Sequence, residues 1–158
     1  MNDIIQVRCP LYLLRSTEPC WRCDLPQSVV ALGTHSLLDD GEGVGDPDDR
    51  LALILLSNIE AMPDAVLEYI TQRNPRYVKQ YSRTADSTYY ANSCDCGANF
   101  GDFYLFSEPG GAFFPLSEEE ASRITYHRMP FVGELPFQCS FSQGPGDHIL
   151  AHGREETA

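Results

Sequence analysis

The sequence is poor in positive charge and in long apolar segments. It has 11 Lys and Arg residues against 23 Asp and Glu residues, which gives a formal net charge of -12. Binding to DNA or RNA requires many cationic contacts with phosphates, so this balance argues against a nucleic-acid partner. The longest apolar run covers only residues 51–56, whereas a membrane-spanning helix needs about 20 residues. We therefore expect neither nucleic acid nor a membrane as the partner.

The amino-terminal segment also lacks the features of a secretory signal. MNDIIQVRCPLYLL has no basic stretch and no small-residue cleavage site, so we expect a cytoplasmic protein. The 158 residues are 42% hydrophobic and 22% charged, which is typical of one globular domain. We expect this domain to cover residues 1–145. The Gly-, His- and Glu-containing segment 146–158 is predicted to be a flexible tail.

Six cysteines are the most informative residues, and four of them form two short pairs. Cys20 and Cys23 have the C-x-x-C spacing that turns two thiolates toward one ion. Cys94 and Cys96 form a tighter pair, followed by Gly97, which permits a positive φ. In a reducing cytosol, clustered cysteines indicate metal binding before they indicate disulfides. We predict that Cys20, Cys23, Cys94 and Cys96 bind one structural Zn²⁺ in a closed tetrahedral site.

Other interpretations of the cysteines stay open at this stage. The four thiols could be free and buried, or one pair could be a disulfide or redox pair. The redox interpretation is less favoured, because a predicted strand rather than a helix follows Cys23. A different ligand set could include Cys9 or Cys139, followed by His35 or His127. We expect Cys9 and Cys139 to be core residues.

The remaining pattern predicts an α+β fold. Helices are expected at 63–73 and 117–125, where Pro63 suits a first turn and Ser117 with Glu120 forms a capping box. Apolar and β-branched runs predict strands at 4–14 with a break at Pro10, 28–32, 51–56, 77–81, 88–90, 103–106, 131–132 and 137–141. We expect an antiparallel sheet of about five to seven strands, with the cysteine pairs on adjacent hairpin ends.

The acidic segment 37–50 is predicted to be a solvated loop. It contains six acidic residues together with glycines and a proline. The acids in 39–49 do not have the spacing of an EF-hand, which leaves loose Ca²⁺ or Mg²⁺ binding as an alternative. The glycines at 41–45 superficially suggest a phosphate-binding loop, but the surrounding acids would repel phosphate.

Two segments carry a resemblance to a known group. Residues 12–33, with Cys20-Trp21-Arg22-Cys23 and the strand VVAL, resemble a group of poorly characterised bacterial proteins that have a C-W-x-C knuckle. Residues 90–106, with NSCDCG and GDFYL, resemble the N-x-C-x-x-C-G and G-D-F-F/Y-L motifs of the same group. This chain departs from the pattern by one residue fewer between Cys94 and Cys96. The resemblance implies a zinc-stabilised fold of unknown activity, in which Trp21, Asn92 and Asp102 support the ligands.

Three classes of function compete for this sequence. We favour a non-enzymatic interaction protein, similar in action to an inhibitor or immunity protein, whose acidic surface meets a basic partner or whose aromatic residues Phe113 and Phe114 mediate homodimer formation. A nucleic-acid-associated zinc module is the first alternative, with the cations of 73–83 as its contact. A zinc-dependent enzyme is the second, and it would need an open coordination position.

Overall fold

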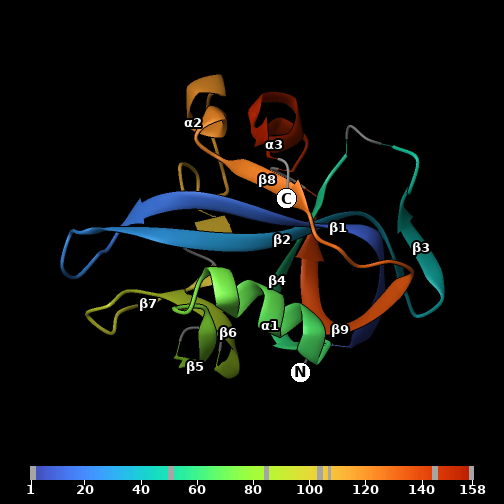
Figure 1. The fold of residues 1–158 in the computed structure, drawn as a ribbon, viewed down its shortest axis with the longest axis horizontal. Coiled ribbons are helices and arrows are strands. Elements are labelled where there is room, and N and C mark those ends of the chain that lie inside the picture. The colour runs from blue at the N-terminus through green and yellow to red at the C-terminus, as the bar shows by residue number, and fades with distance from the viewer. Residues whose placement is uncertain are drawn as a thin grey trace.

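The computed structural model describes residues 3–49, 52–83, 86–102, 105–106, 108–143 and 146–156. These residues form a mostly antiparallel sheet with three short helices, which confirms the predicted α+β class (Figure 1). The helices are α1 (Asp64–Arg73), α2 (Glu118–Ser122) and α3 (Gly146–His152). The strands are β1 (Ile4–Pro19), β2 (Pro26–Asp39), β3 (Glu42–Gly45), β4 (Ile54–Ala61), β5 (Val78–Ser82), β6 (Ser87–Ser93), β7 (Asn99–Phe100), β8 (Thr125–Arg128), β9 (Glu134–Ser142) and β10 (Arg154–Glu155).

A long hairpin of β1 and β2 runs through the centre of the molecule (Figure 1). Its ladder extends from Gln6↔Leu38 to Pro19↔Pro26, so both strands continue well beyond the predicted runs. The register shifts between Arg8 and Leu11. This irregularity lies at Pro10, where the sequence predicted a break because proline lacks an N–H for the ladder.

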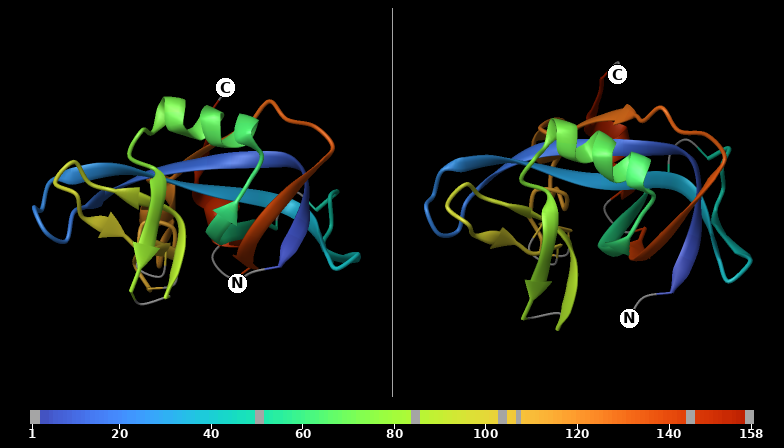
Figure 2. Two further views of the ribbon diagram at one scale, coloured as in Figure 1. Left: turned by 90° about the horizontal axis from the view of Figure 1, so that it is seen from below. Right: turned by 60° about the horizontal axis from the view of Figure 1, so that its bottom comes forward.

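Four strands close into a ring that encloses part of the core. β1 pairs with β2, β2 with β4, β4 with β9, and β9 returns to the first half of β1. α1 lies across one side of the β1–β2 ribbon, as Figure 2 shows. Alternate residues along the ribbon therefore face two cores. The first core contains Leu13 together with Val66 and Ile70 of α1. The second core contains Leu14 together with Ile149 of α3.

The carboxyl-terminal third differs from the prediction in several places. α2 begins after the predicted cap, since the Ser117 hydroxyl accepts from the Glu120 N–H at 3.1 Å. It ends at Ser122 instead of 125, because residues from Thr125 onward pair with β1 as β8. The predicted strand at 131–132 is wrong: these residues lie in the loop between β8 and β9, where Pro130 and Gly133 flank them. The strand predicted at 137–141 is confirmed as part of β9, which begins earlier, at Glu134.

Three further segments depart from expectation. Phe103 and Tyr104 of the predicted strand 103–106 lie outside the described residues; Leu105 is helical, and its N–H donates to the Gly101 carbonyl at 3.2 Å. Part of the predicted loop 37–50 is strand: β2 extends to Asp39, and β3 pairs with the end of β2. The structure also differs from the predicted flexible tail, since Ile149 of α3 is fully buried and β10 pairs with β8.

Candidate metal centre

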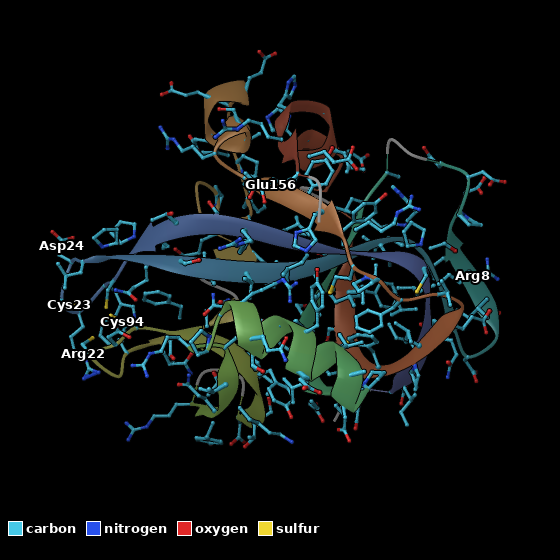
Figure 3. The ribbon with its side chains drawn as sticks, in the orientation of Figure 1. Arg8, Arg22, Cys23, Asp24, Cys94 and Glu156 are labelled. Carbon is cyan, nitrogen blue, oxygen red and sulfur yellow. The ribbon has the colours of Figure 1, made fainter. Side chains whose placement is uncertain are left out.

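Two hairpin turns from distant parts of the chain meet at one end of the molecule. Cys20 and Cys23 lie in the turn that joins β1 to β2, immediately after the terminal pair Pro19↔Pro26. Cys94 and Cys96 lie in the turn between β6 and β7, which the Ser93↔Asn99 pair closes. Figure 3 shows Cys23 and Cys94 side by side at this end. The sequence-based placement of both pairs on adjacent hairpin ends is therefore confirmed.

The four sulfur atoms have the spacing of a metal site. All four Sγ atoms lie within 4.8 Å of one another. The distance from Cys20 Sγ to Cys96 Sγ is 3.7 Å, and that from Cys23 Sγ to Cys94 Sγ is 3.5 Å. A tetrahedral ion with metal–sulfur bonds of about 2.3 Å places its sulfurs about 3.8 Å apart. Both distances are far longer than a disulfide bond of about 2 Å, so this donor set fits one tetrahedral ion.

The two turns use the same local geometry despite their different lengths. The N–H groups of Arg22 and Cys23 donate to Cys20 Sγ, and the N–H of Cys96 donates to Cys94 Sγ. The residue after the second cysteine has a positive φ in each turn: 63° at Asp24 and 93° at Gly97. This conformation suits glycine, and aspartate tolerates it better than most residues. The shorter C-x-C spacing therefore still delivers both sulfurs to the cluster.

The turn geometry also changes the acidity of the thiols. The Ala98 N–H lowers the pKa of Cys96 to about 6, in spite of desolvation. For Cys94, the Cys96 N–H lowers the pKa, but burial and hydrogen bonding with the neighbouring thiols outweigh it and raise the pKa to about 12. Without a metal, the cluster therefore combines a Cys96 thiolate with a protonated Cys94 thiol at neutral pH. A metal ion would displace the remaining protons, so its affinity rises with pH.

Two arginines flank the cluster. Arg22 Nη2 donates to the Cys96 carbonyl at 3.2 Å, which joins one turn to the other. Arg76 Nη2 donates to the Cys94 carbonyl at 2.6 Å, and its Nε lies 3.0 Å from Asp95 Oδ1. Four thiolates carry two more negative charges than a divalent ion neutralises, and these guanidinium groups offset that excess. The sequence carries no signal for this role of Arg76, because only the fold brings its guanidinium beside the second turn.

Trp21 and Asn92, which were predicted to support the ligands, act on the turns and not on the sulfurs. The Trp21 indole is 59% exposed, and its Nε1 donates to the Asn99 carbonyl at 3.0 Å. It thus joins the first turn to β7. The Asn92 side chain both accepts from the Val30 N–H and donates to the Val30 carbonyl, each at 2.9 Å. This buried pair of hydrogen bonds attaches β6 to β2 and fixes how the second turn approaches the first.

Asp102 lies in a different environment from the one predicted. It is buried, and its Oδ2 accepts from the Asn58 N–H at 2.7 Å, where Asn58 has a φ of 49° in β4. Burial raises the pKa of its carboxyl to about 7, although the Asn58 N–H opposes that shift. Asp102 therefore stabilises the irregular part of β4 and not the metal ligands. The sequence could not show this, because the contact depends on a bend within a strand.

The remaining candidate residues lie outside the cluster. Cys139 is buried in the first core, and desolvation raises the pKa of its thiol to about 12. Cys9 is half-buried, and desolvation raises the pKa of its thiol too. His35 contacts the Tyr12 hydroxyl, and His127 contacts that of Tyr69. Within the described residues, the ligand atoms of Cys20, Cys23, Cys94 and Cys96 are the one convergent group of three or more, and the acids of the 39–49 segment form no such group.

The predicted aromatic patch is wrong for one of its two residues. Phe113 is fully buried and packs edge-on against Phe106 with ring centroids 5.4 Å apart. Phe114 is half-buried. The pair follows a glycine-containing turn, which suggested exposure. Instead, the Phe113 N–H donates to the Leu105 carbonyl, and the Phe113 ring lies in the second core.

The cluster can hold a metal ion through four cysteine sulfurs. None of the helices in the described part of the chain is long and apolar enough to cross a membrane. Comparison of the chain with protein-family models, with curated proteins and with solved structures finds no match.

Proposed function

We propose that the four cysteines bind one Zn²⁺ whose role is structural. The single observation behind this proposal is that four sulfurs from two hairpin turns converge at tetrahedral spacing. Zinc prefers such an all-thiolate set, and four protein ligands leave no position for a water or substrate. The ion therefore holds the β1–β2 turn against the β6–β7 turn. The zinc-dependent enzyme, which needs an open position, is correspondingly less favoured.

The test of the zinc proposal is metal stoichiometry in purified variants. We expect one zinc per wild-type chain and loss of stoichiometric zinc in each serine variant of Cys20, Cys23, Cys94 and Cys96. Cys9→Ser is the matched control, because Cys9 is half-buried and belongs to another part of the fold. Retention of a full equivalent of zinc in Cys94→Ser would contradict the four-cysteine set.

For the whole chain we propose a non-enzymatic interaction protein that acts in the cytoplasm and meets a basic protein partner. The net charge of -12 supports it, because a strongly acidic surface steers basic partners and repels nucleic acid. Three of the four cations on which the nucleic-acid alternative depends make local contacts. Arg73 and Lys79 lie over the rings of Tyr69 and Tyr90, and Arg76 pairs with Asp95. We also propose that this chain is related to the poorly characterised bacterial proteins that carry the C-W-x-C and N-x-C-x-x-C-G motifs.

The interaction proposal is tested by crosslinking the zinc-loaded chain in an extract of its native host. We expect crosslinks to lysine- and arginine-rich segments of one protein, and we expect their yield to fall as salt is added, because salt screens exposed charges. Crosslinks that disappear after nuclease treatment would instead favour the nucleic-acid module.

A further inference from the structure

A polar pocket lies at the edge of β1, in the last part of that strand before the turn that carries Cys20 and Cys23. It has a volume of about 280 Å³ and is lined by Arg15, Ser16, Thr17, Ser28, Arg123, Thr125 and Glu156. The lining thus contains two guanidinium groups and four hydroxyl groups against one carboxylate.

The pocket forms where one strand ends and its neighbour continues. β8 pairs with β1 only as far as Arg15↔Thr125, whereas β1 continues to Pro19. Among the described residues, no strand covers the outer edge of β1 beyond Arg15. Arg15 and Thr125 are directly opposite across this ladder, so their side chains point to the same face of the sheet. The C-cap residue of α2, Arg123, completes the wall.

The donors of this pocket have few partners within the protein. Among the ion pairs of the described residues, none includes Arg15, although it is half-buried. Nor does the described part of the chain show a hydrogen bond to the hydroxyls of Ser16, Thr17, Ser28 and Thr125. Arg123 forms one exposed contact, 3.3 Å from Glu119 Oε1 in the same helix. A guanidinium without a carboxylate, beside several free hydroxyls, is an arrangement that an anion would complete.

We propose that this pocket binds the dianionic oxygens of a phosphate monoester. A phosphate group offers three acceptor oxygens and a charge near -2, which matches two guanidinium groups and several hydroxyls better than a planar carboxylate does. Glu156 is the one acid of the lining, and it weakens this binding by repulsion. The net charge of the chain does not prevent binding, because at physiological salt charges beyond about 8 Å are largely screened. The proposal is independent of the metal centre.

Titration of the zinc-loaded, isotope-labelled chain with inorganic phosphate tests this site. We expect saturable amide shifts at Arg15, Thr17 and Thr125, with a Kd in about the millimolar range. Arg15→Gln should weaken binding by at least about tenfold, because a charged hydrogen-bond donor is lost. Glu156→Gln should tighten binding several-fold. Arg128→Gln, at the other end of β8, is the matched control and should leave the affinity unchanged.

The outcomes separate cleanly. Lack of saturable shifts in the wild-type chain, or equal affinity in Arg15→Gln and wild type, would overturn the proposal. If Arg15→Gln does not retain zinc and native amide shifts, Arg123→Gln gives the same decision from another element. A parallel titration with the blocked amide of phosphoserine identifies the source: tighter binding than inorganic phosphate indicates a phosphorylated side chain, and equal binding indicates free phosphate.

Discussion

Removal of Cys23, a ligand of the proposed zinc ion, should destabilise the fold by several kcal/mol. Ser substitution replaces a thiolate with a hydroxyl that stays protonated at neutral pH and coordinates zinc poorly. If zinc affinity falls by about 10³, the native state loses about 4 kcal/mol at zinc concentrations well above the original Kd. For a chain of this length, each kcal/mol lowers the melting temperature by about 2–4 °C. We therefore expect Cys23→Ser to melt about 8–16 °C lower than the wild type.

The contacts that remain between the two turns are too weak to compensate for this loss. Without the ion, the exposed Trp21 Nε1 bond to the Asn99 carbonyl and the Arg22 bond to the Cys96 carbonyl still join the turns. Each is worth about 0.5–1.5 kcal/mol. The buried Asn92 bonds to Val30 lie farther from the turns and hold the strands themselves. We therefore expect the two hairpin ends to open locally while the ring of β1, β2, β4 and β9 persists.

Calorimetry and amide hydrogen exchange measure both parts of this expectation. The wild type treated with a strong chelator should reproduce the Cys23→Ser melting curve, and amides of residues 20–25 and 94–99 should lose protection first. Cys9→Ser serves as the control and should keep the zinc-dependent part of the transition. An unchanged melting curve after verified removal of the metal would refute the reasoning.

Three further predictions concern individual residues, and a fourth concerns nucleic-acid binding. Gly97→Ala should cost about 1–2 kcal/mol in urea unfolding, because φ is 93° there, whereas Asp24→Gly should be neutral or stabilising; a neutral Gly97→Ala would contradict this turn geometry. In the folded protein the pKa of the Asp102 carboxyl is raised from 3.8 to about 7, so the folded carboxyl keeps a proton that the unfolded one releases. The free energy of unfolding of the wild type therefore falls as pH rises from about 5 to 8. Asp102→Asn lacks this titration, so its stability relative to the wild type should rise over the same range. A pH-independent difference between the two melting temperatures would show that Asp102 does not titrate in this way. Phe113→Ala should cost about 3–5 kcal/mol and Phe114→Ala clearly less, and equal losses would contradict their different burial. Fluorescence polarisation at about 0.15 M salt should detect no DNA or RNA binding, and micromolar affinity would favour the nucleic-acid module.

The sequence predicted the four-cysteine cluster because cysteine spacing is a local signal. Cys20, Cys23, Cys94 and Cys96 could be grouped without knowledge of the fold, and the hairpin positions of both pairs followed from the need to share one ion. Their supporting contacts could not be predicted in this way. Arg76 reaches the Cys94 carbonyl only because β5 and β6 pair, and Asp102 reaches β4 only because of the bend at Asn58.

Helix predictions succeeded where a residue type marks the first turn. Ser117 with Glu120 marked the start of α2, and Pro63 preceded α1. The pattern did not separate exposed from buried aromatic residues, so Phe113 was assigned to a surface patch although the Leu105 carbonyl and Phe106 ring hold it inside. The segment from residue 146 was predicted to fray because its composition is polar, but Ile149 is fully buried and Leu150 packs beside it, so α3 is held against the second core.

X-ray absorption at the zinc edge of the purified wild-type chain tests the central claim most directly. The account predicts a first coordination shell of four sulfur atoms at about 2.3 Å and no nitrogen or oxygen ligand. A shell that contains a light-atom ligand, or two sulfurs with water, would contradict the closed four-cysteine centre and restore the open site that an enzyme requires.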